Sequence, residues 1–402
     1  MRQRVVVTGL GLVSSLGNTP DAYWRNLMVG KSGISPVSSF DTSAFRYHLG
    51  GEVKDFEPEA LFTRAEVKVF GRASQFAIYS AHQALNDAKL LDDLEKLGEE
   101  IGAIFGTTFG EAQIIEKATD LLEHDPGQPF CSNLKQYNPN SLSVNVAKKF
   151  GLCGPNMVVP TACSAGNYAI AFGTLLIRTG RAKLIIAGGS DPFSHVSFSG
   201  FSRLGVMTDE KCQPFDKNRK GMLVGEGSAC LVLEEYEHAK TRGAKIYSDV
   251  LGFGLSCDAN HMTAPEIGGV VRVMEKALDD AKLEAKDVDY ISAHGTGTKI
   301  NDYVESNAIR SVFYDKGNKV PVSSIKSMLG HTMGAASILE AIVCILAIRE
   351  GKIPPTVNFV TPDPDCDIDC VPNEPRKLNV DVAMNNSLAF GGNNACVVFG
   401  KV

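Results

Sequence analysis

Short apolar runs alternate with amphipathic stretches along most of this chain. Five runs rich in branched and aromatic residues predict buried strands, and they span 5–7, 101–105, 184–187, 229–233 and 395–399. Between them, the spacing of apolar residues predicts helices over 74–89, 164–179, 270–282 and 334–349. Because buried strands separated by helices are typical of sheets covered on both faces, the pattern predicts an α/β fold.

The chain also contains an internal repeat. Five segments recur in the same order at separations that fall steadily from 243 to 166 positions, and the pairs are 7–12 with 250–255, 84–90 with 277–283, 105–107 with 294–296, 176–180 with 347–351, and 229–233 with 395–399. This order predicts a duplication with halves at 1–243 and 244–402. Two such halves are expected to pair about a pseudo-twofold axis, with the functional site between them.

Composition narrows the class of protein. The 402 residues include 40 Lys and Arg against 46 Asp and Glu, which gives a formal charge of −6, and 44% are hydrophobic. This is an ordinary globular composition, and its mild acidity argues against broad binding to nucleic acid or to an anionic membrane. The longest apolar runs, such as 342–348, are far shorter than the roughly 20 residues of a membrane span. Since the apolar run near Met1 is also too short for a signal peptide, we expect a soluble cytoplasmic protein.

Ten cysteines are scattered along the chain, and none forms a Cys-x-x-Cys pair. In a large chain without a secretion signal, free thiols are the default. Cys366 and Cys370 lack a second pair of ligands nearby, so no metal site is predicted.

Cys163 stands out because small residues flank it and a predicted helix follows it, in the segment 159–166. A tight turn before a helix would present the thiol to the helix dipole and to free N–H groups, and these are expected to lower its pKa and favour the thiolate. A buried structural cysteine explains the local pattern equally well, so the pattern alone leaves both interpretations open.

His294 and His331 both lie in glycine-flanked loops before predicted helices. A lone histidine is more often structural, but the repeat places the segment 326–331 opposite the segment that holds Cys163. The duplication therefore brings these loops towards one centre.

At this point a resemblance to a known family becomes clear. The segments 161–164, 294–298, 326–331 and 386–393 resemble motifs of the β-ketoacyl-acyl carrier protein synthases, and within that family the chain is most similar to the elongating type II fatty-acid and polyketide enzymes. The segment 216–227 resembles a further family stretch, and the likeness runs from Val5 to Phe399. The resemblance implies the thiolase fold, an internally duplicated αβαβα layered architecture with two pseudo-twofold-related halves, which agrees with the repeat.

The resemblance also implies a decarboxylative Claisen condensation. Cys163 would carry the acyl group, and the backbone N–H groups of Cys163 and Phe390 would bind the oxyanion. His294 and His331, both neutral, would donate to the thioester oxygen of malonyl-acyl carrier protein and stabilise the enolate. Lys326, expected to pair with Glu305, would control the charge state and the geometry of the two histidines.

Further site residues follow from the same resemblance. Thr296 and Thr298 would bind the phosphopantetheine arm, and Phe390 would act as a gate with room to swing beside Gly391. Phe109, in a segment that is richer in glycine in many housekeeping enzymes, would contact the acyl group, and Glu111 and Leu388 would also alter the acyl pocket.

The implied partners are an acyl carrier protein and a second copy of this chain. The phosphopantetheine arrives on the carrier protein, so no cofactor and no metal are expected. The departures at Phe109, Glu111 and Leu388 leave two alternatives open: a specialised polyketide or polyene ketosynthase, and a heterodimer of it with a chain-length-factor-like subunit. An inactive scaffold subunit is the non-enzyme alternative, and Cys163 argues against it. A thiolase is disfavoured because 385–394 contain no second cysteine.

Overall fold

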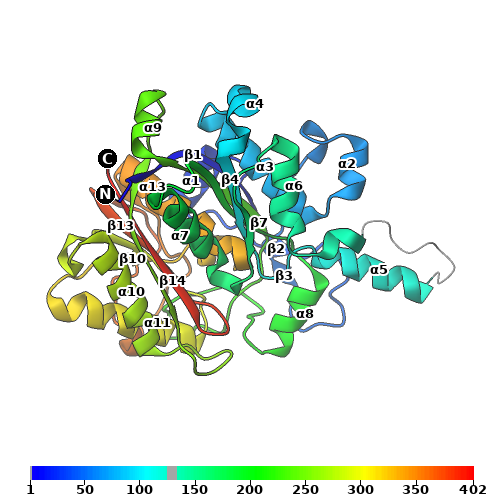
Figure 1. The fold of residues 1–402 in the computed structure, drawn as a ribbon. Coiled ribbons are helices and arrows are strands. Elements are labelled where there is room, and N and C mark those ends of the chain that lie inside the picture. Colours follow the sequence, from blue (N-terminus) through cyan, green and yellow to red (C-terminus); the bar gives the residue numbers. More distant parts are fainter. Residues whose placement is uncertain (1, 125–133) are drawn as a thin grey trace.

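A ten-stranded mixed sheet runs through the computed structural model, which describes residues 2–124 and 134–402 (Figure 1). In spatial order the strands are β10 (Val322–Ser323), β9 (Tyr290–Ser292), β13 (Val382–Ser387), β14 (Asn393–Gly400), β8 (Ser248–Cys257), β1 (Val5–Ser14), β7 (Gly227–Glu235), β6 (Leu184–Asp191), β4 (Ile101–Gly106) and β5 (Asn156–Val159). Two short ladders join β2 (Ser35–Pro36) to β3 (Leu49–Gly50) and β11 (Lys352–Ile353) to β12 (Arg376–Lys377).

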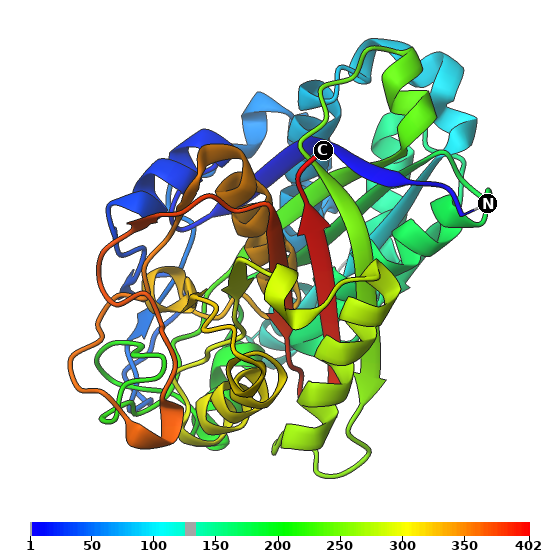
Figure 2. The same cartoon turned by 90° about the vertical axis from the view of Figure 1, so that its left-hand side faces the viewer.

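The sheet is symmetric about the contact between β1 and β8. These two strands have ten residues each and pair antiparallel through Val6 with Asp249 and Val7 with Ser248. Outward from this centre, each half has two antiparallel neighbours followed by two parallel ones. Figure 2 shows β14, in red, beside β8. The predicted duplication is therefore visible in the order and the direction of the strands.

Helices cover the two halves in the same way. In the first half α3 (Arg72–Asp87) packs on β1 and β7, and in the second half α10 (Ile267–Ala281) packs on β8 and β14. Between the halves, α7 (Ala165–Arg178) contacts α13 (Ala336–Glu350). Residues 336–348 of α13 are all buried, which marks it as a central helix. This arrangement confirms the predicted layered thiolase fold.

The remaining elements connect these layers. The other helices are α1 (Pro20–Met28), α2 (Arg64–Val69), α4 (Leu94–Leu97), α5 (Ala112–His124), α6 (Ser141–Phe150), α8 (His195–Arg203), α9 (Tyr236–Thr241), α11 (Lys299–Val312) and α12 (Lys326–Leu329). Short 3-10 helices lie between them, and two matter for the site: η5 (Ala162–Ser164) before α7 and η8 (Met333–Ala335) before α13. No helix within 2–124 and 134–402 is long and apolar enough to cross a membrane.

Each predicted strand and helix is present, with bounds that differ by a few residues. The main difference is β1, which continues to Ser14 through a Gly-x-Gly segment. A Cβ at Gly9 would lie 2.1 Å from the carbonyl oxygen of Ala84 in α3, so glycine allows the helix to lie directly against the strand. In β8 of the other half, a Cβ at Gly254 would lie 2.1 Å from the carbonyl oxygen of Val273 in α10. The repeated glycines thus serve helix packing in both halves.

Candidate active site

Cys163 lies at the junction of a strand and a helix. It is the middle residue of η5, and its side chain is 5% exposed. Ala162 before it has a φ of +50°, a left-handed conformation that non-glycine residues seldom adopt. Ser164 donates from Oγ to the carbonyl oxygen of Asn393 at 2.7 Å, and Ser387 donates to the carbonyl oxygen of Cys163 at 3.1 Å. The cysteine turn is therefore fixed against the C-terminal half.

The duplication repeats this turn in the second half. Met333, the residue equivalent to Ala162, has a φ of +54° and begins η8. The two turns contact each other, and His331 lies two residues before Met333. The pseudo-twofold axis thus places the strained turn that carries Cys163 against the one that carries His331.

His294 completes a cluster of three buried side chains. Its ring centroid lies 5.3 Å from that of His331, with an angle of 82° between the ring planes. The Sγ of Cys163 and one ring nitrogen from each histidine all lie within 4.8 Å of one another. A reacting carbonyl group can therefore contact all three side chains at once.

Hydrogen bonds define the tautomer of both histidines. The backbone N–H of Met333 donates to Nδ1 of His331 at 3.1 Å, and Nζ of Lys326 lies 3.4 Å from Nδ1 of His294. An ammonium and a backbone N–H can only donate, so each Nδ1 is an acceptor and the proton is on Nε2. Burial, with a contribution from the charge of Lys326, lowers the pKa of both imidazoles well below their usual value. Both rings are therefore neutral Nε2–H donors.

Lys326 forms its ion pair with Glu340 in α13, through a very short contact between Nζ and Oε1. The predicted pair between Lys326 and Glu305 is wrong. Glu305 instead accepts the backbone N–H groups of His294 and Gly295, each at 2.7 Å, and the side chain of Asn386 at 2.8 Å. Burial raises the pKa of Glu305 to about 7, although these donors partly oppose the shift. Glu305 therefore supports the loop that holds His294, while Glu340 partners the lysine.

The state of the thiol differs from the sequence prediction. Burial raises the pKa of Cys163 to about 12, although the charge of Lys326 and the backbone N–H groups of Phe390 and Cys163 favour the thiolate. The predicted depressed pKa is wrong because α7 begins two residues later, at Ala165, and because the sulfur is removed from water. The backbone N–H groups of Phe390 and Cys163 nevertheless both point towards Sγ, as the donors of an oxyanion hole would.

A pocket of about 340 Å³ leads from the cluster to the surface. Both halves line it, and it contains Thr296, Thr298, Leu388 and Phe390 of the predicted substrate contacts. The hydroxyl groups of the two threonines lie 2.9 Å apart. The pocket reaches exposed residues such as Lys220 and Met262, so a substrate can approach the cluster from the surface.

The other predicted contacts lie beside this pocket. Phe390 packs on Phe201, with 6.1 Å between ring centroids, and Phe201 packs on Phe109 at 6.3 Å. Phe109 therefore lies behind Phe201 instead of on the pocket wall. Gly391 has a φ of +85° in the turn after Phe390, and its N–H donates to the carbonyl oxygen of Met262 at 2.7 Å.

Glu111 does not contact the pocket. Its buried carboxylate accepts the backbone N–H groups of Ala73 at 3.3 Å and of Ser74 at 2.7 Å, at the start of α3. Our expectation that it alters the acyl pocket is therefore not supported by its position, since its contacts are those of a helix cap.

Two residues of the site were missed from the sequence. Glu340 is the only acidic residue in the first fourteen positions of α13, and a lone acid in a buried helix was a usable signal. Asp191, fully buried, accepts the backbone N–H groups of Phe109 at 2.8 Å and Gly334 at 2.6 Å, and thus ties the loop after β4 to η8. Its position at the end of an apolar strand gave no hint of this role.

Cys163, His294 and His331 are also the kind of side chains that bind zinc. A metal would need the lone pair on the nitrogen of each histidine that faces the site. Nδ1 of each ring already accepts a hydrogen bond, which leaves the proton on Nε2 and no lone pair free on either ring. The geometry therefore favours hydrogen-bond donation to an oxygen atom over metal binding.

Comparison with known proteins identifies the family of this chain. The family model described as "Beta-ketoacyl synthase, N-terminal domain" matches residues 2–239, and that described as "Beta-ketoacyl synthase, C-terminal domain" matches 247–360. A curated relative from Synechocystis, named 3-oxoacyl-[acyl-carrier-protein] synthase 2, is 42% identical over all of this chain and 98% of its own length.

Solved structures give the same picture. The ishigamide ketosynthase/chain length factor superposes with a TM-score of 0.96 at 43% identity, with full coverage of both chains. A type II polyketide ketosynthase in complex with its acyl-carrier protein and bound to the hexaketide superposes with a TM-score of 0.90 at 33% identity, again with full coverage of both.

Proposed function

This chain belongs to the beta-ketoacyl synthase family and is a condensing acyltransferase, and we propose how its site carries out the condensation. The reaction lengthens an acyl chain by two carbons, as in fatty-acid elongation. The observation that carries the proposal is a buried cluster in which the Cys163 thiol and one ring nitrogen of each histidine lie within 4.8 Å of one another, while both rings are neutral.

The first step transfers an acyl group to Cys163. Sγ attacks the carbonyl carbon of an acyl-carrier thioester, and the backbone N–H groups of Cys163 and Phe390 stabilise the oxyanion. Because the pKa of the thiol is raised to about 12, the proton leaves Sγ as the sulfur–carbon bond forms. That proton ends on the sulfur of the departing carrier arm.

The second step uses the two histidines. The thioester oxygen of malonyl-carrier protein accepts both Nε2–H groups, and the carbon–carbon bond to the carboxylate breaks to release carbon dioxide. The electron pair of that bond forms an enolate, whose negative oxygen stays on the same two donors. Neutral donors suit this step, because they stabilise the enolate without protonating it.

The third step joins the two carbon chains. The enolate carbon attacks the carbonyl carbon of acyl-Cys163, and the resulting oxyanion again binds the backbone N–H groups. The intermediate then expels the Cys163 thiolate, which takes up a proton from the solvent, the one proton that the overall reaction consumes. The products are a 3-oxoacyl-carrier thioester and free enzyme.

Lys326 keeps the histidines in this state. Its charge near Nδ1 of His294 disfavours protonation of that ring, and its pair with Glu340 holds it in position. Glu305 orients the backbone of His294 from the other side. These residues act on the reaction through the histidines.

The pocket fits the phosphopantetheine arm of a carrier protein. Thr296 and Thr298 offer hydroxyl groups to its amides, and Phe390 lies between the arm and the acyl side, where it serves as a gate with Gly391 as its flexible neighbour. Phe109 bounds the acyl side from behind Phe201. The arm arrives with the substrate, so we propose that the enzyme needs no metal and no cofactor of its own.

The partners follow from the same chemistry. An acyl carrier protein delivers both substrates, and we propose that the chain acts as a homodimer in the cytoplasm. Carrier proteins are acidic, so we propose that basic residues contribute to docking, among them Arg64 and Lys68 in α2. Arg72, at the start of α3, has a structural role instead, because it donates to the buried carboxylate of Glu226 at 2.8 and 2.7 Å.

A second candidate is a polyketide ketosynthase that works with a chain-length-factor-like subunit. The close superposition with the ishigamide ketosynthase/chain length factor supports it. Both candidates share the three steps above and differ in the acyl group and in the second subunit. An inactive scaffold is disfavoured by the complete cluster.

The roles can be tested by separating acylation from decarboxylation. His294→Ala and His331→Ala should still acquire an acyl group on Cys163 but should decarboxylate malonyl-carrier protein at least about a hundredfold more slowly, as expected for the loss of an oxyanion donor. Mass spectrometry follows acylation, and carbon dioxide release follows decarboxylation. Normal decarboxylation in both variants would rule out the enolate role.

Cys163→Ala distinguishes an enzyme, which loses condensation, from a scaffold, which keeps its function.

A further inference from the structure

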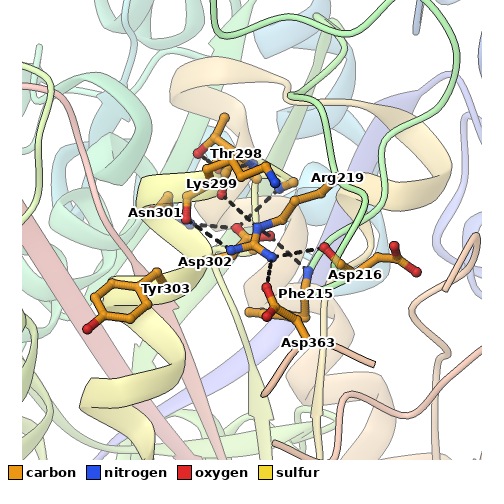
Figure 3. A network of polar contacts seen from close by, with 12 residues as sticks. Phe215, Asp216, Arg219, Thr298, Lys299, Asn301, Asp302, Tyr303 and Asp363 are labelled. Atoms are coloured by element: carbon orange, nitrogen blue, oxygen red, sulfur yellow. Dashed lines mark hydrogen bonds and ion pairs between the residues drawn. The ribbon is translucent and has the colours of Figure 1, made fainter. Parts of the chain in front are cut away.

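Arg219 is a buried cation whose side chain is 3% exposed, in the segment between α8 and β7 (Figure 3). It pairs with Asp363 through Nη1 in a very short contact, and its Nε lies 3.7 Å from Oδ2 of fully buried Asp302. None of these three side chains is among the proposed reacting groups. Burying charged groups costs free energy that their pairing offsets only in part, so stability alone is a weak explanation of this cluster.

The guanidinium joins the pocket wall to the rest of the fold. Arg219 donates to the carbonyl oxygens of Thr298 at 3.3 Å and Lys299 at 3.1 Å, at the start of α11. It also donates to the carbonyl oxygen of Asp216 at 2.9 Å, within its own segment. Figure 3 shows the guanidinium in the middle of these partners.

Asp302 contacts the same wall. Its carboxylate accepts the backbone N–H of Gly297 at 3.2 Å and that of Phe215 at 2.8 Å. Phe215 has a φ of +65°, which is unusual for a bulky residue and persists only where the surroundings hold it. Thr296 and Thr298 flank Gly297, so the cluster fixes the backbone between the two threonines at the N–H of Gly297 and at the carbonyl group of Thr298.

We propose that Arg219 is a positioning residue for the phosphopantetheine arm of the carrier protein. By fixing the backbone at Thr298 and Lys299, it holds the hydroxyl groups of Thr296 and Thr298 where the arm binds. This inference rests on the proposed function, because the arm is the group assigned to Thr296 and Thr298. Arginine suits the role because a planar fork of five donors reaches several acceptors at once, whereas lysine is a flexible point donor. Loss of the guanidinium should therefore weaken binding of the phosphopantetheine arm and leave the reactions at the thiol and the histidines unchanged.

The test compares two malonyl substrates in the Arg219→Lys variant. Malonyl-pantetheine carries the arm, whereas S-ethyl malonate thioester ends two carbons beyond the sulfur. For malonyl-pantetheine, we expect KM for decarboxylation to rise about tenfold while kcat changes less than about threefold. For the S-ethyl thioester, kcat/KM should stay within about twofold of the wild-type value.

Arg178→Lys is the matched control. Arg178 is also a buried arginine, pairs with Asp280 at 2.8 Å, and donates to the carbonyl oxygens of Val250 at 3.2 Å and Leu251 at 2.8 Å, away from the pocket. It should resemble Arg219→Lys in thermal stability and the wild type in both KM values. A role of Arg219 in stability alone would make the two variants alike.

Each outcome is decisive. An unchanged KM for malonyl-pantetheine, or an equal loss for both substrates, overturns the positioning role. If the wild type decarboxylates neither substrate, the proposed function fails and the inference fails with it. If Arg219→Lys does not fold, Asp363→Asn replaces it, because it removes the charged partner of Nη1 and should shift KM in the same direction by a smaller factor.

Discussion

The two histidines have to remain neutral at a pH where many histidines are partly charged. Burial is the main cause of their lowered pKa values, and the charge of Lys326 adds to it. The sequence motifs pointed to His294, His331 and Lys326, but not to their protonation states. Those states depend on the hydrogen bonds at Nδ1 and on the burial, which exist only in the folded chain.

We therefore expect no titration of these rings between pH 5.5 and 8. Nitrogen NMR of the histidine-labelled enzyme should show two neutral Nε2–H imidazoles across this range, both absent from the double variant His294→Ala/His331→Ala. A signal that becomes imidazolium near pH 6.5 and disappears in either single variant would contradict the account.

The same shifts predict how stability depends on pH. The unfolded chain binds protons at both histidines as pH falls below about 6.5, whereas the folded chain does not, so stability is lost with a slope of ~1.4 kcal/mol per pH unit per ring. Glu305, with a pKa raised to about 7, has the opposite sign and costs stability as pH rises from 4.5 to 7. Replacing His331 with glutamine should therefore lower the acid sensitivity measured by denaturant unfolding at pH 5.5 and 7.5, and an unchanged difference would contradict a neutral buried ring.

Cys163 should react as a thiol of high pKa. Its alkylation by iodoacetamide should accelerate about tenfold per pH unit without a plateau below pH 10, because only the thiolate reacts. Removal of the favourable charge in Lys326→Ala should slow the reaction further at each pH. Exposed Cys153 is an internal reference in the same peptide map. A plateau near pH 7 would show that the thiol is activated in the resting enzyme.

At the level of single residues, motif resemblance identified Cys163 and both histidines but gave the wrong partner for Lys326. Glu305 and Glu340 are both buried carboxylates near the lysine, and only the fold distinguishes them. A lone acid in the apolar segment 336–349 was the available signal, because a charge in a central helix needs a partner.

At the level of elements, the central pair of helices has little tolerance for added volume. α7 and α13 meet where Gly166 faces α13, and a Cβ at Gly166 would lie 2.7 Å from the backbone nitrogen of Ile338. The backbone nitrogen of Ile338 lies in the first turn of α13, and a backbone atom cannot move aside as the end of a flexible side chain can. The crossing of these helices also sets the position of Cys163, three residues before Gly166.

Gly166→Ala should destabilise the enzyme by about 1–3 kcal/mol, the usual cost of overpacking. It should also slow acylation of Cys163. Gly173→Ala in the same helix is the control, because its new Cβ would meet side-chain atoms only, Cδ1 of Leu233 at 2.9 Å and Cγ2 of Ile185 at 3.0 Å, and no backbone atom of α13. Thermal unfolding and the acylation rate measure both effects. Equal effects of the two substitutions would show that helix propensity, not the crossing, is responsible.

The elements themselves followed from periodicity, and their bounds did not. Continuation of β1 to Ser14 depends on the close approach of α3 at Gly9 and Gly11, which is a tertiary contact. The glycines gave a visible signal, but helix packing and a phosphate-binding turn both use such a segment.

At the level of the whole molecule, the repeat in the sequence corresponds to a symmetric sheet, with β1 and β8 at its centre. The separations between repeated segments were enough to predict two related halves. The pairing of β1 with β8 was not predictable, because it joins strands from different halves and leaves no local pattern.

The sheet has an exposed edge that fits the proposed dimer. β5, four residues long, is the last strand of the first half, and Met157 within it is 40% exposed. An uncharged edge strand is a surface on which a second chain can add. We expect the 43.1 kDa chain to elute as a dimer in light-scattering chromatography.

Met157→Glu should shift this equilibrium towards the monomer, since a charge on an edge strand opposes pairing. Val29→Glu, at an exposed position after α1, is the control and should leave the dimer unchanged. A wild-type chain that is monomeric alone, and dimeric only with a second subunit, would favour the chain-length-factor alternative.

The central claim is a decarboxylative condensation on Cys163, and intact-protein mass spectrometry tests it most directly. The purified chain receives an acyl-carrier protein and then malonyl-carrier protein. We predict that the acyl mass appears on the Cys163 peptide, disappears when malonyl-carrier protein is added, and is found in a 3-oxoacyl-carrier product two carbons longer. Formation of that product by Cys163→Ala, or stable acylation of Cys163 in the wild type with no decarboxylation, would contradict the mechanism.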